Sequence, residues 1–297
     1  MPLEPIGPTD AVELYLTDRE AELTRATLNS HRTRLSHFVR WCDDHEVENL
    51  NTLTGRQLHE YRLWRRSDGS LSPLSEKTQM GTIRVFIRWI ESIDGVQQEL
   101  HTKVRSPTLS SDDKSWDVML SSERADRVLD CLRKYKYASR QHVVLALLWH
   151  TMMRVGAVPA LDIEAYDQDE QYLQVKHRPD TGTPIKNADK GERLVALSDD
   201  VCTLVANWIA DRRPAVTDDR GRAPLVASEH GRVHRSILRR DCYRFTRPCV
   251  FTEECPHDRD IDECDAASHD QSYECPSSVS PHALRRGGLQ LTCQKKF

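Results

Sequence analysis

The segment QHVVLALLWHTMMRV, residues 141–155, is an almost wholly apolar run that ends beside an arginine. This composition predicts a central core helix, because a surface helix would keep a polar face. The following LDIEAYDQDEQYLQVKHR shifts to short strand patterns, and RLVALSDDV comes after the turn-rich PDTGTPIKNADKGE. Together these segments predict a β-hairpin or a small three-stranded antiparallel sheet beside the helix.

The rest of the chain is predicted to be mainly helical. Residues 9–100 show helical stripes without a strand signal, and Thr54 is placed to cap one helix. Residues 101–117, rich in Ser, Asp and Pro, are predicted to be an interdomain linker. We therefore expect an N-terminal helical bundle at 9–100 and a C-terminal, mostly helical domain at 118–297 that carries the small sheet.

Composition narrows the class of protein. The 297 residues suffice for two domains, and 38% apolar with 30% charged residues is typical of a globular protein. No apolar run reaches the roughly 20 residues that span a membrane. The start, MPLEPIGPTD, has no basic, apolar leader, so we expect a cytoplasmic protein.

Arginine dominates the basic residues. It accounts for 32 of the 42 Lys and Arg residues, although the net charge is −4. Arg suits bidentate contacts to phosphate better than Lys does, while a codon bias would explain the same excess without function. Polar helix faces with clustered Arg predict phosphate contacts to duplex DNA at Arg32, Arg34, Arg40, Arg84, Arg88, Arg235, Arg239 and Arg240.

Four basic residues in the second half form a candidate catalytic set. Arg154 lies at the end of the apolar helix, Lys186 lies in the hairpin turn, and His282 and Arg285 share one face of a late helix in SPHALRRGG. Two guanidinium groups could neutralise the charge of a pentacoordinate phosphate, Lys could protonate a leaving 5′-oxygen, and His could act as acid or base.

These segments, taken in order, resemble the tyrosine recombinase (phage integrase) family over nearly the whole chain. WHTMMRVGAVPALDIEAYD is similar to its first-arginine box, KNADKGERLVALSDD to its Lys-bearing hairpin and SPHALRRG to its His-x-x-Arg box. SPLSEKTQMGTIRVFIRWI resembles the last helix of its SAM-like core-binding domain. The resemblance implies that Arg154 and Arg285 bind the scissile phosphate, Lys186 is the general acid and His282 assists proton transfer.

The sequence also departs from the family pattern. RVGAV lacks an acidic residue after the first Arg, and the long hairpin leaves Lys190 as a competitor of Lys186. No Tyr follows Tyr273, whereas the resemblance implies a nucleophilic Tyr several turns after the His-x-x-Arg box. We therefore expect a C-terminally truncated homologue that is inactive in cis. The alternatives are a Tyr supplied in trans and one of the existing Tyr acting as nucleophile.

A Cys-rich insertion, residues 249–275, precedes that box. Four thiols with His257 and His269 nearby could form a tetrahedral structural zinc site, although their spacing matches no standard finger. The alternative is a set of free thiols in a reducing compartment. The predicted ligands are Cys249, Cys255, Cys264, Cys275 and His257.

Our leading hypothesis is a DNA-binding recombinase homologue that needs no cofactor for catalysis. The alternatives are a non-catalytic DNA-binding regulator with a zinc-braced domain and a metal-dependent enzyme built on the Cys/His cluster. The expected partners are double-stranded DNA and further copies, as a tetramer on DNA, or an intact recombinase, without a membrane.

Overall fold

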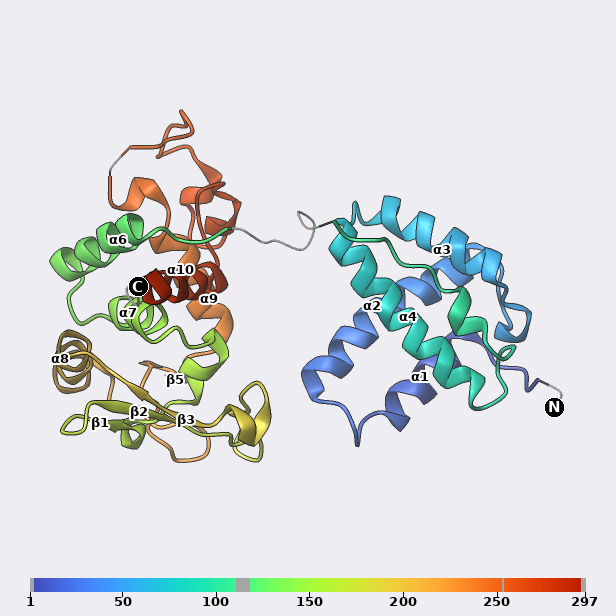
Figure 1. Cartoon of the computed structure of the whole chain (residues 1–297), viewed down its shortest axis with the longest axis horizontal. Helices are drawn as coiled ribbons and strands as arrows, with labels where there is room; N and C mark the ends of the chain where they lie inside the picture. The colour runs from blue at the N-terminus through green and yellow to red at the C-terminus, as the bar shows by residue number, and fades with distance from the viewer. Residues whose placement is uncertain (1–2, 111–117, 253, 295–297) are drawn as a thin grey trace. The chain divides into compact units, whose positions relative to one another are not determined.

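The computed structural model describes residues 3–110, 118–252 and 254–294. The chain divides into two compact units, Met1–Trp116 and Asp117–Phe297 (Figure 1). Most of the described chain is helical, with two small antiparallel sheets, which confirms the predicted fold class. Among the described residues, no helix combines the length and apolar character that crossing a membrane requires.

Within its described residues, the first unit is a bundle of four helices. α4 packs against α1, α2 and α3, and its start is fixed by the Ser72 cap ahead of Pro73. Thr54 and Gln57 form a capping box at the start of α3, as predicted for Thr54. The helices are α1 (Pro8–Asp18), α2 (Arg25–Asp44), α3 (Gly55–Asp68) and α4 (Pro73–Glu91), with 3₁₀ turns η1 (Leu50–Thr52) and η2 (Leu100–Lys103).

Aromatic rings fill the centre of this bundle. Phe38 contacts Trp41, Tyr61 and Phe86, and all four are almost fully buried. Edge-to-face and stacked contacts of this kind add to the apolar burial that holds the helices together. The helical stripes read from the sequence therefore become the inner faces of α2, α3 and α4.

The predicted linker at 101–117 is partly wrong. Its first residues, 101–103, belong to η2, and Val104 is buried in the core of the first unit, as is Leu100 at the start of η2. Arg84 holds this segment by donating to the Val104 carbonyl at 2.7 Å and to the Ser106 hydroxyl at 3.0 Å. Two apolar anchors spaced four residues apart were too weak a signal to reveal this packing. Residues 111–117 lie outside the described residues.

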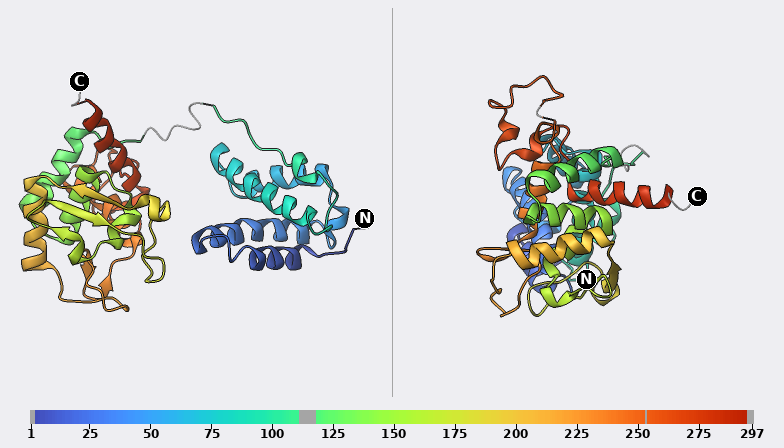
Figure 2. Two further views of the ribbon diagram at one scale, coloured as in Figure 1. Left: turned by 60° about the horizontal axis from the view of Figure 1, so that its bottom comes forward. Right: turned by 90° about the vertical axis from the view of Figure 1, so that its left-hand side faces the viewer.

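The second unit is built around α7, as the apolar run predicts. α7 (Arg140–Thr151) buries residues 142–149 without a gap and packs against α6, α8, α9 and α10. Figure 2 shows α10 beside α7, with the sheet on a different side of the unit. The other helices are α6 (Ser122–Tyr135), α8 (Asp199–Asn207) with the π-helical turn η6 (Trp208–Arg212), α9 (Arg235–Phe245) and α10 (Pro281–Gln294).

The predicted sheet has three strands in sequential order. β2 lies between β1 and β3, and the pair Leu173 and Val195 sets the register of β2 against β3. Leu173 and Val175 are buried, while their neighbours along β2 are half-buried, which is the alternation expected of a sheet with one covered face. The strands are β1 (Tyr166–Asp167), β2 (Tyr172–Val175) and β3 (Arg193–Ala196).

A second, two-stranded sheet was not predicted. β4 (Ala227–Ser228) and β5 (Gly231–Arg232) form a tight hairpin in which Gly231 has a φ of 97°. Strands of two residues give no periodic signal, so only the turn sequence hinted at this element. Other short turns are η3 (Val155–Ala160), η4 (Ile163–Ala165), η5 (Ala188–Gly191), η7 (Pro248–Val250), η8 (Asp265–Ala267) and η9 (Ser272–Glu274).

The Cys-rich insertion is closed at its base. Arg124 of α6 donates to the backbone carbonyls of Thr246 and Ser277, which flank the insertion on either side. The Thr246 hydroxyl also accepts from the Val279 amide at 2.9 Å. These contacts bring the two ends of the insertion together. The end of α9 and the start of α10 therefore lie close to each other although the insertion separates them in the sequence.

Candidate functional site

One pocket of the second unit gathers all four predicted catalytic residues. Its volume is about 360 Å³. It is lined by Arg154, Lys186, His282 and Arg285, together with Arg235. Among the described residues that line this pocket, none is acidic. We call these five side chains the cationic pocket.

Arg154 reaches this pocket because the preceding helix stops early. α7 ends at Thr151, and Met152 takes a left-handed conformation with a φ of 52°. Arg154 then lies in extended backbone immediately before η3, and not at the end of the apolar helix where the sequence placed it. The sharp change of direction leaves the Arg154 side chain exposed at the pocket.

The glycine pair after the His-x-x-Arg box sets the position of α10. A Cβ atom on Gly287 would lie 2.1 Å from the Leu120 carbonyl, and one on Gly288 would lie 2.5 Å from the Trp149 carbonyl. Only glycine allows α10 to approach α7 this closely. The same approach lets Arg285 donate from Nε to the Met152 carbonyl at 2.6 Å.

The structure separates the two candidate lysines. Both lie in the long connection between β2 and β3, and both are exposed. Lys186 lines the pocket, whereas Lys190 lies in η5 and is not among the described lining residues. Backbone contacts near Lys186 hold the connection, since the His177 ring accepts from the Ile185 amide at 3.1 Å.

Positive charge dominates the electrostatics of the pocket. Burial lowers the pKa of His282, and the charges of Arg286, Arg285, Arg154 and Lys186 lower it further. His282 is therefore a neutral imidazole near pH 7, able to accept or share a proton. Burial, followed by repulsion from Arg154 and Arg193, lowers the pKa of Arg285.

Sequence reasoning missed part of this charge cluster. Arg235 was expected to contact DNA but not to join the catalytic set, and it reaches the pocket as the first residue of α9. Arg193 acts on Arg285 from the start of β3, and Arg286 acts on His282 from the next position of α10. Only the adjacency of Arg285 and Arg286 was visible in the sequence.

The Arg residues of the first unit that are predicted to contact DNA differ in their exposure and in their contacts within the protein. Arg32 and Arg88 are exposed. Arg34 donates to the Thr82 hydroxyl at 3.1 Å, while Arg84 is committed to the Val104 segment described above. Arg40 pairs with Asp68 and lies over the Trp64 ring.

The Arg residues of α9 in the second unit also differ in their exposure and internal contacts. Arg239 is exposed and lies over the Tyr243 ring, with its guanidinium carbon 5.5 Å from the ring centroid. Arg240 pairs with Asp270 of the insertion at 2.8 Å. All of these Arg residues remain predictions as DNA contacts, and those with internal partners have fewer donors left for phosphate.

The predicted zinc ligands do not form a metal site. Within residues 3–110, 118–252 and 254–294, no three His, Cys, Asp or Glu side chains could hold one ion together. Burial raises the pKa of the Cys249 thiol, and the nearby Cys275 and Cys255 raise it further, so these thiols are neighbours. His257 contacts the Ser277 hydroxyl at 3.0 Å instead. The placed residues do not fit tetrahedral zinc.

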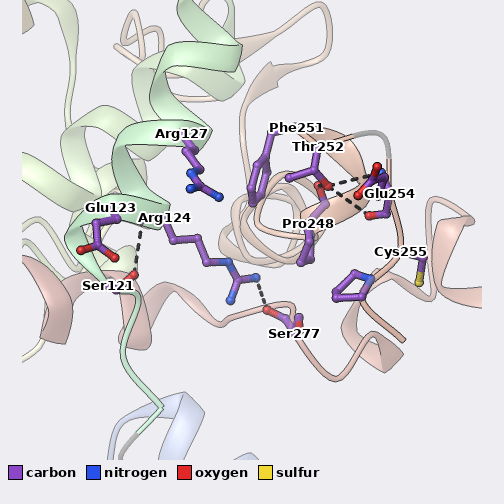
Figure 3. A pocket seen from close by; sticks show the side chains of 11 residues that line it. Ser121, Glu123, Arg124, Arg127, Pro248, Phe251, Thr252, Glu254, Cys255 and Ser277 are labelled. Atoms are coloured by element: carbon purple, nitrogen blue, oxygen red, sulfur yellow. Dashed lines mark hydrogen bonds between the residues drawn. The ribbon is translucent and has the colours of Figure 1, made fainter. Parts of the chain in front are cut away.

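A larger pocket lies between α6 and the insertion (Figure 3). Its volume is about 500 Å³, and Glu123, Arg127, Phe251 and Glu254 line it. Acidic and basic groups are mixed there, and Arg124 is already occupied by the backbone at the base of the insertion. This pocket lacks the uniform charge of the cationic pocket.

Comparisons with known proteins agree with this architecture. No protein-family model matches the chain. It is 24% identical to tyrosine recombinase XerD of Oceanobacillus iheyensis over 216 residues, which are 72% of this chain and 68% of that protein.

Solved structures show the same fold. The integrase of transposon Tn1549, in complex with circular intermediate DNA, is 12% identical with a TM-score of 0.68, covering 98% of this chain and 88% of that one. Lambda integrase, a dimer bound to a COC′ core site, is 11% identical with a TM-score of 0.65, covering 98% and 91%.

The fold is therefore the one these solved integrases have, with a helical first unit and a mixed second unit. By sequence and by fold, the chain is similar to the tyrosine recombinase (phage integrase) family.

Proposed function

We propose that the chain binds duplex DNA for site-specific recombination and holds one backbone phosphate in the cationic pocket. A single observation carries this proposal: five basic or titratable side chains converge on a pocket whose described lining contains no acid. Such a cluster is electrostatically unfavourable by itself, and a phosphodiester supplies the missing negative charge.

Each group has a role that its geometry supports. Arg154 and Arg285 contact the non-bridging oxygens of the phosphate, since guanidinium groups donate in a fork that matches them. Lys186 carries the proton for a departing 5′-oxygen. His282, kept neutral by burial and by the surrounding cations, accepts or relays a proton.

The nucleophile is the element that the 297 residues do not offer in this pocket. All Tyr residues precede His282, and none of the six in the second unit lines the cationic pocket. Burial, with the neighbouring Cys202 and Asp167, raises the pKa of Tyr166 to about 12, which makes it a poor nucleophile. We propose that this chain holds the phosphate but forms no phosphotyrosyl bond in cis.

The test combines binding with covalent trapping. Fluorescence anisotropy should show duplex binding that weakens about a hundredfold between 50 mM and 200 mM salt, as expected for about four phosphate contacts. Denaturing gels with a nicked suicide duplex should show no covalent adduct. Lys186→Ala should weaken binding, and Lys190→Ala, from the same connection, is the matched control and should not.

Two results would overturn the proposal in different ways. Affinity that does not change with salt, or equal effects of Lys186→Ala and Lys190→Ala, would remove the cationic pocket as the phosphate site. A covalent adduct formed by the unmodified chain would show that one of the existing Tyr residues is the nucleophile. Sedimentation with DNA tests whether a tetramer assembles on the duplex.

A further inference from the structure

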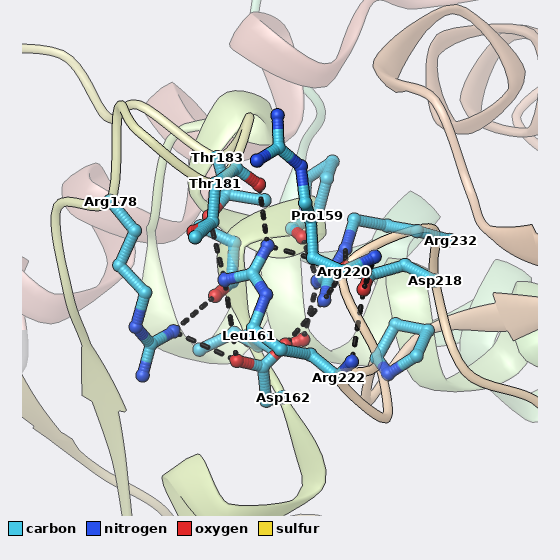
Figure 4. Close-up of polar contacts among 12 residues, drawn as sticks. Pro159, Leu161, Asp162, Arg178, Thr181, Thr183, Asp218, Arg220, Arg222 and Arg232 are labelled. Atoms are coloured by element: carbon cyan, nitrogen blue, oxygen red, sulfur yellow. Dashed lines mark hydrogen bonds and ion pairs between the residues drawn. The ribbon is translucent and has the colours of Figure 1, made fainter.

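A second cluster of charges lies beside the cationic pocket. Figure 4 shows guanidinium groups converging on two carboxylates. Asp162 is 5% exposed and pairs with Arg232 at 2.5 Å, Arg178 at 2.9 Å and Arg222 at 3.6 Å. Asp218 pairs with Arg232 at 2.7 Å and with Arg222 at 3.3 Å. We call these five residues the Asp162 network.

The network joins three segments that are far apart in the sequence. Arg232 also donates to the carbonyls of Pro159 and Leu161, at 2.6 and 3.3 Å. Arg222 donates to the Thr181 carbonyl at 2.8 Å and to the Thr183 hydroxyl at 3.1 Å. The η3 segment, the β2–β3 connection and the β5 hairpin are thereby tied together.

Each tied segment leads into the cationic pocket within a few residues. Arg154 precedes Pro159 by five positions, Lys186 follows Thr183 by three, and Arg235 follows Arg232 by three. The residues held by the network and the pocket residues therefore lie on the same short backbone segments. Neither His282 nor Arg285 belongs to these segments, since both lie on α10.

The network opposes a repulsion that the pocket creates. Arg154, Lys186 and Arg235 carry like charges. Without DNA, their mutual repulsion pushes apart the three segments on which they lie. The Asp218 carboxylate remains ionised: burial raises its pKa, but hydrogen bonds from Arg222, Arg232 and Arg220 outweigh that effect and hold the pKa at about 2. The hydrogen bonds thus persist across the neutral range.

We propose that the Asp162 network is a positioning device, which preorganises Arg154, Lys186 and Arg235 for one phosphate before DNA arrives. This inference rests on the proposed function, because it assumes that the cationic pocket binds a phosphodiester. Binding to a preorganised site avoids the cost of assembling like charges at the moment of association. Asp162 contacts no DNA in this arrangement and acts through the segments it joins.

A double-mutant cycle on the full chain tests the inference, with a short DNA duplex as the probe in fluorescence anisotropy. Asp162→Asn should weaken binding by about two- to tenfold, the range expected for residues coupled through one network. In a Lys186→Ala/Arg235→Ala background the same substitution should change affinity less than twofold, because the groups it positions are gone. A purely structural role would give equal losses in both backgrounds.

Arg178→Ala provides a milder variant in case Asp162→Asn fails to fold. Its side chain is 27% exposed, and its described contacts are with Asp162 of the network and with the Ala160 carbonyl. Glu76→Gln is the matched control, since Glu76 forms a similarly buried pair with Arg62 in the first unit. It should lower thermal stability without coupling to Lys186 and Arg235.

The outcomes separate the inference from the proposed function. If Lys186→Ala/Arg235→Ala leaves DNA affinity unchanged, the proposed function fails. If that double variant weakens binding but Asp162→Asn and Arg178→Ala act equally in both backgrounds, the proposed function stands and the positioning role is overturned.

Discussion

The cationic pocket and the Asp162 network contain similar residues in opposite surroundings. In the network, each of three Arg residues pairs with a carboxylate, and Asp162 is 5% exposed. In the pocket, the described lining offers no acidic partner, and burial, followed by repulsion from neighbouring cations, lowers the pKa of both His282 and Arg285. The arginines of the network are neutralised by carboxylates of the same chain. The arginines of the cationic pocket have no acidic group in the described lining to balance their charge.

This contrast predicts a large stability loss from the network. Asp162→Ala leaves three Arg side chains without their shared acceptor, so the free energy of unfolding should fall by about 3–5 kcal/mol in urea denaturation. Asp130→Ala is the control, because Asp130 and Arg133 form a pair with side chains 62% and 67% exposed. It should cost below about 1 kcal/mol. Equal losses would erase the distinction between the two regions.

The glycine contact of α10 tests how the other half of the pocket is held. Gly287→Ala places a Cβ atom 2.1 Å from the Leu120 carbonyl and 2.7 Å from the Trp149 ring of α7, so α10 must shift away from both. We expect a loss of about 1–3 kcal/mol in the free energy of unfolding, together with weaker DNA binding as His282 and Arg285 move.

Gly81→Ala in α4 is the control for this substitution. A Cβ atom there meets nothing within 4 Å, so the change should be neutral or stabilising by up to about 1 kcal/mol. Unchanged stability and DNA affinity in Gly287→Ala would show that the close approach of α10 to α7 is not required.

Removing an arginine of the cationic pocket should change DNA affinity far more than stability. Arg154→Ala removes a like charge from an exposed position, so the free energy of unfolding should stay within about 0.5 kcal/mol of the parent. DNA affinity should fall by about tenfold, the lower end for a charge-assisted contact. Urea denaturation and anisotropy measure the two effects separately. A variant that lost stability and kept its affinity would place Arg154 among the structural arginines.

The smallest expected effect is a pH dependence. The free chain holds the pKa of His282 below 6.5, and a bound phosphate would raise it, so binding takes up a proton. Affinity should therefore rise modestly as pH falls below 6.5, and His282→Ala should remove that part of the profile. By the same sign, the unliganded chain loses stability below pH 6.5, because the unfolded state binds the proton more readily. Identical pH profiles for parent and variant would exclude His282 as the responsive group.

The positions of individual site residues were only partly accessible from the sequence. The order of Arg154, Lys186, His282 and Arg285 could be read directly, because helix and strand periodicities placed each beside a recognisable element. Arg235 was assigned to a general basic surface, since a linear pattern does not reveal which end of α9 faces a pocket. The choice between Lys186 and Lys190 needed the path of the β2–β3 connection.

The sequence by itself determined the two-unit helical architecture, the buried α7 and the three-stranded sheet, because local hydrophobic periodicity encodes which faces are covered. Tertiary structure alone decided the Asp162 network, whose members are separated by up to 70 positions from Asp162 to Arg232. It also showed that the placed thiols do not gather into a metal site among the described residues. Ion pairs between residues far apart in the sequence form only when tertiary packing brings their segments together. A local sequence pattern does not predict that packing.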